Sequence, residues 1–191
     1  MVSWCSTALA ISALAGAFLL TGCASTPPLP SYGVVPEFTL VDQTGANFSR
    51  AALDKRVWVA DFIFTNCPGP CPRMSSQMHQ VQAALDGERD MRFLSFTVDP
   101  ARDTPLVLAA YARHFEAQPG KWFFLTGTVA DLNRMSRGVF MLGDVDGSLQ
   151  HSTRFALMDR ASRIRGYYLT SDEDAIPRLI ADAKRLLKEK F

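Results

Sequence analysis

Residues 61–78 read DFIFTNCPGPCPRMSSQM, and in this stretch an apolar run leads into a loop that holds two cysteines four positions apart. Residues 57–64 are β-branched and aromatic, which predicts a short strand buried on both faces of a sheet. Prolines and a glycine interrupt any regular pattern between positions 66 and 70. From residue 72 apolar side chains recur at helical spacing until Gly87. The stretch therefore predicts a strand, a loop and a helix.

The two cysteines occupy different places in this predicted unit. We expect Cys67 in the loop and Cys71 just before the helix, near its N-cap, with Pro72 as the first helical residue. Unpaired N–H groups and the positive end of the helix dipole favour a thiolate there, so both cysteines should have depressed pKa values. Thiolates serve metal binding and disulfide exchange. The alternative is a purely structural role, as two buried apolar cysteines or a stabilising disulfide.

The other two cysteines lie in an N-terminal apolar segment. Residues 8–20 are too short to span a bilayer comfortably but suit the core of a signal peptide. They end in Leu20-Thr21-Gly22-Cys23, which looks like a bacterial lipobox with Cys23 as the acylated residue. No Lys or Arg precedes it, so an N-terminal anchor that is never cleaved is the alternative. We expect a lipoprotein signal peptide over residues 1–22 and a lipid-anchored protein on the periplasmic side of a bacterial cell envelope.

Length and charge indicate one domain that does not bind nucleic acid. The chain has 191 residues, with 20 Lys and Arg against 19 Asp and Glu and a net charge of +1, and this balance argues against nucleic acid as a partner. Residues 23–33 predict a flexible tether rich in Ser, Thr and Pro, followed by a single domain over residues 34–191. Only Cys67 and Cys71 remain as free thiols in the mature chain, which is therefore no disulfide-dense scaffold.

Strands and helices alternate along the domain in an order that predicts an α/β fold. A small hairpin over residues 36–48 precedes the strand at 57–64, and another strand at 91–98 follows the cysteine helix, which implies a right-handed βαβ unit. The remaining expected elements are a helix begun by Pro105, a strand at 122–125, a short helix towards Met135, two antiparallel strands at 150–158 and 164–169, and an amphipathic helix at 172–190. Together they predict a mixed central sheet flanked by helices, with an N-terminal hairpin extension.

Three histidines compete to complete a metal site with the cysteines. His79 lies eight positions past Cys71 on the same predicted helix, a rise of about 12 Å, which excludes it from a site at that cysteine. His114 borders the buried stripe of its helix and suits a polar boundary position. His151 precedes a strand in a polar loop, and imidazole is the commonest metal-ligand type, so His151 is the preferred candidate.

Other side chains near the cysteines offer weaker candidates. Met74 and Met78 carry thioethers, but their helical spacing is typical of core packing. Asp99 and Asp103 follow the carboxyl end of a strand, where open α/β sheets place their sites, and they could equally cap the next helix. Two thiolates and an imidazole suit Cu(I) and also accept Cu(II) with a weak extra ligand. Zinc is the alternative metal, because two cysteines, a histidine and water make an open zinc site.

Several blocks of the sequence resemble one family. These blocks are FTNCPGPCP (64–72), FTVDPARDTP (96–105) followed by YARHF (111–115), WFFLTG (122–127), and HSTRFALMD (151–159) followed by RGYY (165–168). In matching order over about residues 34–190, they resemble the Sco/SenC family of copper-binding, thioredoxin-like proteins. The resemblance implies a thioredoxin-like fold.

The resemblance also implies a site and a role. It places copper ligands at Cys67, Cys71 and His151, and gives Asp99 or Asp103 a place beside the ligands or facing a partner. The family assists assembly of the copper centre in cytochrome c oxidase subunit II, as a copper donor, as a thiol reductant of the receiving cysteines, or both. A partner of that kind is therefore expected for this chain.

Three functions remain open on the sequence. In the first, a metallochaperone binds one copper ion through Cys67, Cys71 and His151 and passes it on by ligand exchange. In the second, an extracytoplasmic thiol-disulfide oxidoreductase uses the two cysteines to reduce a copper-receiving protein, and His151 matters little. The third is a peroxiredoxin-like peroxidase, which would need Thr65 and an arginine beside its reactive cysteine. The cysteines are spaced more widely than the usual CxxC redox pair, and this spacing favours chelation of a metal over disulfide exchange. Together with the lipobox, it leads us to predict a lipid-anchored copper chaperone.

Overall fold

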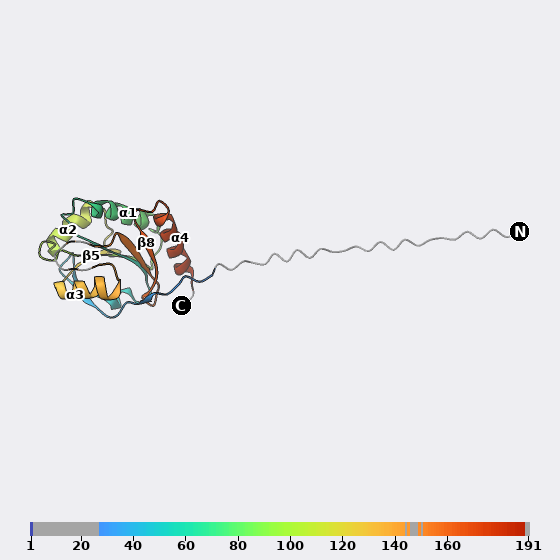
Figure 1. Cartoon of the computed structure of the whole chain (residues 1–191), viewed down its shortest axis with the longest axis horizontal. Helices are drawn as coiled ribbons and strands as arrows, with labels where there is room; N and C mark the ends of the chain where they lie inside the picture. Colours follow the sequence, from blue (N-terminus) through green and yellow to red (C-terminus); the bar gives the residue numbers. More distant parts are fainter. Residues whose placement is uncertain (2–26, 144, 146–148, 150, 190–191) are drawn as a thin grey trace.

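The computed structural model describes residue 1 and residues 27–189, apart from positions 144, 146–148 and 150 (Figure 1). Apart from residue 1, the predicted signal peptide over residues 1–22 lies outside the described residues, as does the predicted lipidation site Cys23. Within the described part of the chain, no helix has both the length and the apolar character needed to cross a membrane.

An eight-stranded mixed sheet forms the centre of the domain. Its strands are β1 (Gly33–Val34), β2 (Thr39–Asp42), β3 (Asn47–Ser49), β4 (Val57–Ile63), β5 (Met91–Thr97), β6 (Trp122–Thr126), β7 (Arg154–Met158) and β8 (Arg163–Leu169). They lie in the order β1-β8-β7-β4-β5-β6-β2-β3, in which β4, β5 and β6 are parallel and every other pairing is antiparallel. The predicted mixed sheet and the predicted hairpin, formed by β2 and β3, are therefore confirmed.

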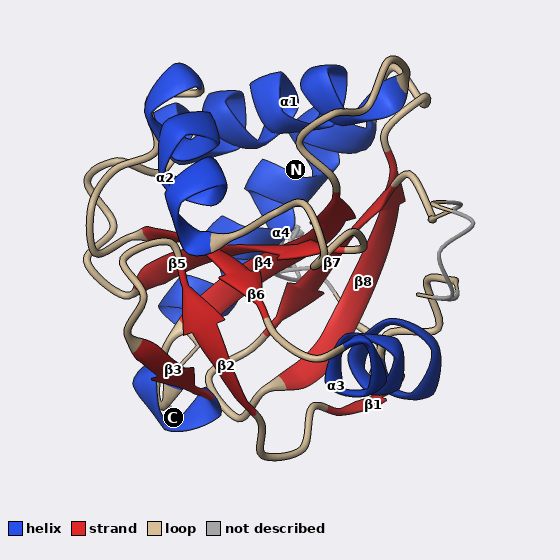
Figure 2. Cartoon of the chain, turned by 90° about the vertical axis from the view of Figure 1, so that its left-hand side faces the viewer, coloured by secondary structure: helices blue, strands red, loops and turns tan. Residues whose placement is uncertain are grey.

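Helices cover both faces of this sheet. They are η1 (Arg50–Leu53), α1 (Pro70–Ala84), α2 (Pro105–His114), α3 (Val129–Asn133), the π-helical turn η2 (Arg134–Val139) and α4 (Ala175–Lys188). Figure 2 shows α1, α2 and α4 on one face and α3 on the other. The order β4–α1–β5–α2–β6 makes two successive βαβ units, as parallel neighbours require.

The cysteine helix begins earlier than the sequence predicts. Its first residue is Pro70 and its N-cap is Gly69, so Cys71 lies inside the first turn instead of just before the helix. The expectation that Pro72 is the first helical residue was wrong because Pro70, two positions earlier, has the same preset φ and the same harmless lack of an N–H group. In this first turn the Cys71 side chain is fully buried in the core.

The central strand β4 carries the cysteine loop at its carboxyl end. All seven of its residues are buried, which confirms a strand covered on both faces. Its register with β5 is parallel throughout and pairs Ile63 with Thr97 at the end nearest the loop. The one charged residue in the strand is Asp61, whose exposed fraction is 0%.

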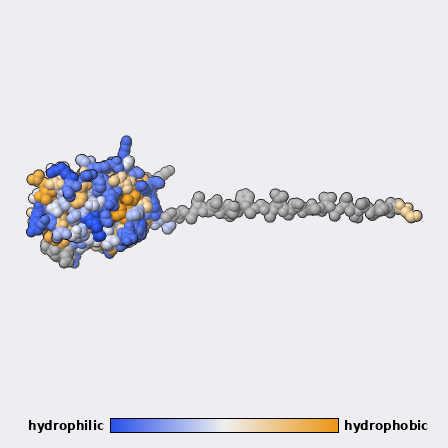
Figure 3. All heavy atoms as spheres, turned by 90° about the horizontal axis from the view of Figure 1, so that it is seen from above, coloured by the Kyte–Doolittle hydropathy of each residue, from blue (hydrophilic) through white to orange (hydrophobic). Residues whose placement is uncertain are grey.

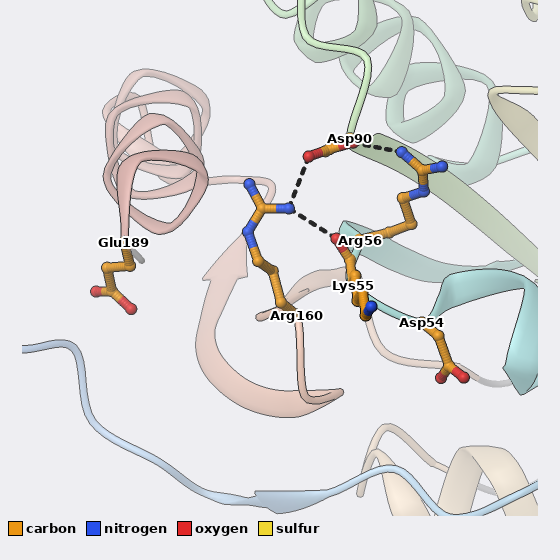
Figure 4. Close-up of a pocket in the computed structure, with 6 residues that line it drawn as sticks. All are labelled: Asp54, Lys55, Arg56, Asp90, Arg160 and Glu189. Carbon is orange, nitrogen blue, oxygen red and sulfur yellow. Dashed lines mark hydrogen bonds and ion pairs between the residues drawn. The ribbon is translucent and has the colours of Figure 1, made fainter. Parts of the chain in front are cut away.

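A charged hollow lies at the other end of β4 (Figure 4). Arg160, in the turn between β7 and β8, donates to a carboxylate oxygen of Asp90 at 2.8 Å and to the carbonyl of Lys55 at 2.7 Å. Arg56 pairs with the other carboxylate oxygen of Asp90. These paired charges hold the start of β4 against the loop that precedes β5 and against the β7–β8 turn.

Small apolar areas are scattered over the surface. In the view of Figure 3 they alternate with polar areas on the globular body. The most exposed large apolar side chains of the domain are Tyr32, Val34, Leu106, Val107, Val129 and Met141. Leu106 and Val107 belong to the first turn of α2, and Met141 to the segment before His151.

The β7–β8 turn contains a buried ion pair. Arg165 is 7% exposed, and it donates to Asp159 at 2.8 Å, while Arg163 donates to the same carboxylate at 2.7 Å. Arg165 also donates to the carbonyls of Leu29 at 2.7 Å and Pro30 at 2.8 Å, and so holds the chain before β1 against the domain. Burial alone would raise the pKa of Asp159, but hydrogen bonds from Arg163, Arg165 and two backbone N–H groups lower it.

Replacing Arg165 with methionine should destabilise the fold by about 2–4 kcal/mol, because it leaves a buried carboxylate with one partner fewer and two carbonyls unpaired. Urea unfolding at pH 7 measures the loss. The loss should shrink below about pH 4, where the unfolded state protonates its carboxyls and Asp159 no longer gains from the pair. The Arg163→Met variant is the control, since the Arg163 side chain is 49% exposed, and an equal loss there would contradict the assignment.

Candidate metal centre

Three segments far apart in the sequence meet at one edge of the sheet. The loop 64–69 leaves the carboxyl end of β4, and the residues after β5 lie beside it, because the Val98 N–H donates to the Ile63 carbonyl at 2.8 Å. Since β7 runs antiparallel to β4, the residues that precede β7 reach the same edge. This is the edge at which open α/β sheets place their functional sites.

Cys71 and His151 are in direct contact at this edge. The Sγ atom of Cys71 lies 3.2 Å from Nε2 of His151, although the two residues are 80 positions apart. Cys71 is fully buried, and the His151 ring packs edge-on against Phe64 with 5.9 Å between ring centroids. Two of the three predicted ligands are thus neighbours.

The hydrogen bond of the other His151 nitrogen, Nδ1, determines which tautomer the imidazole ring adopts. Nδ1 lies 3.1 Å from the carbonyl oxygen of Ser152, which accepts only when Nδ1 carries the proton. In the neutral ring the lone pair is then on Nε2, which faces the Cys71 thiol. Metal-binding histidines are commonly held in this way, with the non-ligating N–H donated to a carbonyl.

Burial keeps both groups of this pair neutral. It raises the pKa of the Cys71 thiol, and a hydrogen bond with Cys67 and the charges of Cys67 and Asp61 raise it further, while a backbone hydrogen bond from Phe64 opposes them. Burial also lowers the pKa of His151, offset in part by the Ser152 carbonyl. The prediction of a depressed pKa was therefore wrong for Cys71, because the loss of solvation of a fully buried thiol outweighs the field of the helix N-terminus.

Cys67 lies at the surface side of the pair. It is half-buried against the core, and both Cys67 and Cys71 are free thiols. Across the described residues, no three His, Cys, Asp or Glu side chains are already arranged to hold a metal ion. Cys67 already makes a hydrogen bond with Cys71, so a three-ligand site requires only a rearrangement that brings Cys67 and His151 to the same ion.

The donor atoms fit a soft metal ion after a small adjustment. With a metal–sulfur bond of about 2.3 Å and a metal–nitrogen bond of about 2.0 Å, two ligands of one tetrahedral or trigonal ion lie roughly 3.5–3.7 Å apart. The observed 3.2 Å between Cys71 Sγ and His151 Nε2 is slightly shorter. The pair is thus close to the spacing of two ligands on one ion, and its sulfur and imidazole donors are of the type that selects copper or zinc.

Asp103 holds the loop before the cysteines in place. Its side chain is 1% exposed and accepts hydrogen bonds from the Thr65 N–H at 3.2 Å, the Thr65 hydroxyl at 2.5 Å and the Thr97 hydroxyl. These bonds tie the loop to the end of β5. Asp103 therefore holds the start of the cysteine loop against the end of β5.

Asp99 makes different contacts. Its backbone N–H donates to the Thr97 hydroxyl at 2.9 Å, and its carboxylate pairs with Arg102 at 3.4 Å. The helix that follows is capped by neither aspartate, since the Thr104 hydroxyl accepts from the Val107 N–H at its N-terminus. The capping role considered for Asp99 and Asp103 is therefore filled by Thr104.

The remaining candidate ligands lie elsewhere. Met74 and Met78 are fully buried in the core, as their spacing predicts. His79 and His114 line a different hollow, between α1 and the end of α2. His79 lies on the same helix as Cys71, eight residues further on, and this separation excludes it as a ligand at the cysteine site.

The sequence did not reveal the supporting roles of three residues near this edge. Thr65 and Thr97 became recognisable only through their shared bonds to Asp103, which depend on tertiary contacts. Asp61 did give a signal, as the one charge in an apolar run, but its fully buried carboxylate and its influence on the Cys71 pKa required the structure.

The fold and the cysteine loop at the end of a central parallel strand define a thioredoxin-like protein. The chain belongs to the SCO1/SenC family, whose model matches residues 27–188. The SCO1 protein homolog of Bacillus subtilis is 44% identical over 98 residues, an alignment that spans 51% of this chain and 50% of that protein.

Solved structures of the same family match over most of the domain. A SCO1/SenC family lipoprotein from Bacillus anthracis has a TM-score of 0.75 at 32% identity, over 82% of this chain and 96% of that one. BsSco, a member of the Sco family of cytochrome c oxidase assembly proteins in which a disulfide switch was identified, has a TM-score of 0.73 at 29% identity, over 86% and 100%. Yeast Sco1 with copper bound has a TM-score of 0.64 at 25% identity, over 84% and 96%.

Proposed function

We propose that this protein is a copper metallochaperone that binds one copper ion through Cys67, Cys71 and His151 and assists assembly of the copper centre of cytochrome c oxidase. The observation that carries the proposal is the 3.2 Å contact between Cys71 Sγ and His151 Nε2 at the carboxyl edge of the parallel strands. Family membership supports it, because a yeast member of the family has been solved with copper bound.

The three ligands have unequal parts in this proposal. Cys71 and His151 form the fixed half of the site, since both are held by the core and by the Ser152 carbonyl. Cys67 forms the exchangeable half, because it lies in the loop 64–69 with its thiol partly accessible. Copper can therefore be passed on by ligand exchange that starts at Cys67, while Cys71 and His151 keep their positions.

The expected partner is cytochrome c oxidase subunit II or a similar copper-receiving protein. Exposed Leu106 and Val107 follow the loop that contains Asp103, and exposed Met141 precedes Leu142, whose carbonyl accepts from the Ser152 N–H at 2.8 Å. These apolar side chains near the site offer contacts to another protein. We place the protein on the periplasmic side of the envelope through a lipid on Cys23, a proposal supported by a solved family member described as a lipoprotein.

The test is Cu(I) binding by the full-length chain, solubilised in mild detergent and fully reduced, with Cys5 and Cys23 replaced by serine throughout. Competition with a coloured Cu(I) chelator should give one tightly bound ion. Cys67→Ser, Cys71→Ser and His151→Ala should each weaken binding by more than about tenfold. The control His114→Ala removes an exposed histidine away from the site and should bind as the parent does. A parent that binds no copper, or a His151→Ala variant that binds equally well, would overturn the proposal.

One observation favours thiol–disulfide exchange as a second candidate. Cys67 is partly accessible, whereas Cys71 is buried beside it. The Cys67 thiolate would attack a partner disulfide and release one partner thiolate; Cys71 would then attack Cys67 and release the second, leaving a Cys67–Cys71 disulfide. The attack by Cys67 does not use His151, so formation of the mixed disulfide should keep its rate in His151→Ala, and the same variant separates the two functions.

A further inference from the structure

Two of the three histidines in the chain are not explained by the copper proposal, and they share one hollow. His79 lies on α1 and His114 in the last turn of α2, and both line this hollow together with Ser76, Gln80, Phe115 and Glu116. We propose that His79, His114 and Glu116 form a second metal site, which takes a borderline divalent cation, with Cu²⁺ as the best fit.

The backbone around the hollow is firmly held. Gln82 on α1 is 2% exposed, and its side chain donates to the Glu116 carbonyl at 3.1 Å and accepts from the Gln118 N–H at 2.9 Å. These two bonds fasten the turn after α2 to α1. The side chains that face the hollow from the two helices therefore keep a constant separation.

His79 is oriented as a ligand would be. Its Nδ1 lies 3.1 Å from the Phe115 carbonyl oxygen, so Nδ1 donates and the lone pair of the neutral ring is on Nε2. Nε2 faces the Glu116 carboxylate across 4.0 Å, which is too long for a hydrogen bond. Bonds of about 2.0–2.2 Å from an ion to each atom would span this gap when the two atoms lie on opposite sides of the ion.

His114 and Glu116 supply the remaining donors from the exposed side. His114 is exposed, with its ring edge-on to Phe115 at 4.8 Å between centroids, and the Glu116 side chain is 80% exposed. The three side chains are not gathered around one point in this structure, so the site is completed by rotation of these two. Among the described residues that line the hollow, none is a lysine or arginine that would repel a cation.

The donor chemistry distinguishes this site from the cysteine site. Two imidazoles and a carboxylate are borderline to hard donors, which suit Cu²⁺ or Zn²⁺ and disfavour Cu⁺, and Cu²⁺ binds such sets most tightly among the divalent ions. His79 lies two helical turns, about 12 Å, from Cys71, so the two sites do not share a ligand. The inference is independent of the proposed function.

The test uses Cu²⁺ alone and the full-length chain in mild detergent, with all four cysteines replaced by serine and with His151→Ala. The chain has three histidines, so His79 and His114 are then the only imidazoles left. Calorimetry should show one equivalent of bound Cu²⁺, and electron paramagnetic resonance should show splitting by two imidazole nitrogens. His79→Ala and His114→Ala should each remove one nitrogen and weaken binding by at least about tenfold.

Glu116→Gln should weaken binding while keeping both nitrogens, and Gln80→Ala, at an exposed position of the same hollow, is the matched control. A spectrum that His114→Ala leaves unchanged would overturn the proposal. If the multiply substituted chain does not fold, the parent and its His114→Ala variant are compared directly. Because His114 is exposed, this comparison should show one equivalent of imidazole-bound Cu²⁺ fewer in the variant, and equal stoichiometry and equal spectra would overturn the site. Either outcome leaves the Cu(I) result at the cysteines unaffected.

Discussion

Asp61→Asn should make the protein more stable by about 2–4 kcal/mol at pH 8, with little change at pH 4.5. Asp61 lies in the middle of β4, and neither of its carboxylate oxygens has a hydrogen-bond partner of normal geometry among the described residues. Burial raises its pKa from 3.8 to about 7, and the neighbouring Ser95 hydroxyl only partly offsets that effect. A difference of this size corresponds to about 4 kcal/mol between the two protonation states.

The direction with pH follows from the raised pKa of Asp61. Between about pH 4 and pH 7 the folded protein keeps a proton that the unfolded chain releases, so the free energy of unfolding falls as the pH rises through this range. Above pH 7 the folded state contains a buried, unpaired carboxylate, and the cost is complete. Asparagine has no charge to bury, so the variant should lose this part of the pH dependence.

Urea unfolding at pH 4.5, 6 and 8 measures the effect of Asp61→Asn. Asp54→Asn is the control, because Asp54 is exposed, and its effect should stay within about 0.5 kcal/mol at every pH. A variant that is less stable than the parent at pH 8 would show that the carboxylate has a partner that compensates its burial.

Asp103→Ala should destabilise the protein by about 3–5 kcal/mol, because it leaves three buried hydrogen-bond donors without an acceptor. The three donors that lose their acceptor are the Thr65 N–H and the hydroxyls of Thr65 and Thr97. The loop that carries Cys67 then loses its tie to β5. We therefore also expect Cu(I) affinity to fall by about tenfold or more, as is usual when a residue that orients metal ligands is removed.

Chelator competition and urea unfolding test Asp103 together. Asp99→Ala is the matched control, since Asp99 follows the same strand but its carboxylate pairs with the exposed Arg102. Its variant should keep most of the stability. Equal losses in the two variants would contradict the assignment of the loop contacts to Asp103.

Much of the fold follows from local sequence patterns. The run at 57–64 is short and almost wholly apolar, and only a central strand buries such a run, so β4 and its parallel neighbour β5 were predictable. The hairpin of β2 and β3 and the antiparallel pair β7 and β8 likewise follow from turn residues between alternating segments.

The parts that sequence reasoning missed depend on contacts between distant segments. β1 has two residues, and it is a strand only because it pairs with β8 at Arg163 and Ile164. The pKa of Cys71 depends on its depth in the core, which the shift of the helix start to Pro70 decides. The meeting of Cys71 with His151 needs β7 beside β4, and no spacing in the sequence encodes that distance.

The place where the chain enters the sheet affects how the protein can work at a membrane. β1 joins β8 at its first residues, and Ile164 there pairs with Met158, which in turn pairs with Trp58 near the start of β4. Cys71 and His151 lie past the opposite end of β4, whose seven residues span about 23 Å at 3.3 Å each. With the proposed lipid on Cys23, the copper ligands would therefore lie at the end of the domain opposite to the tether, where a receiving protein can approach them without contacting the chain that leads to the lipid.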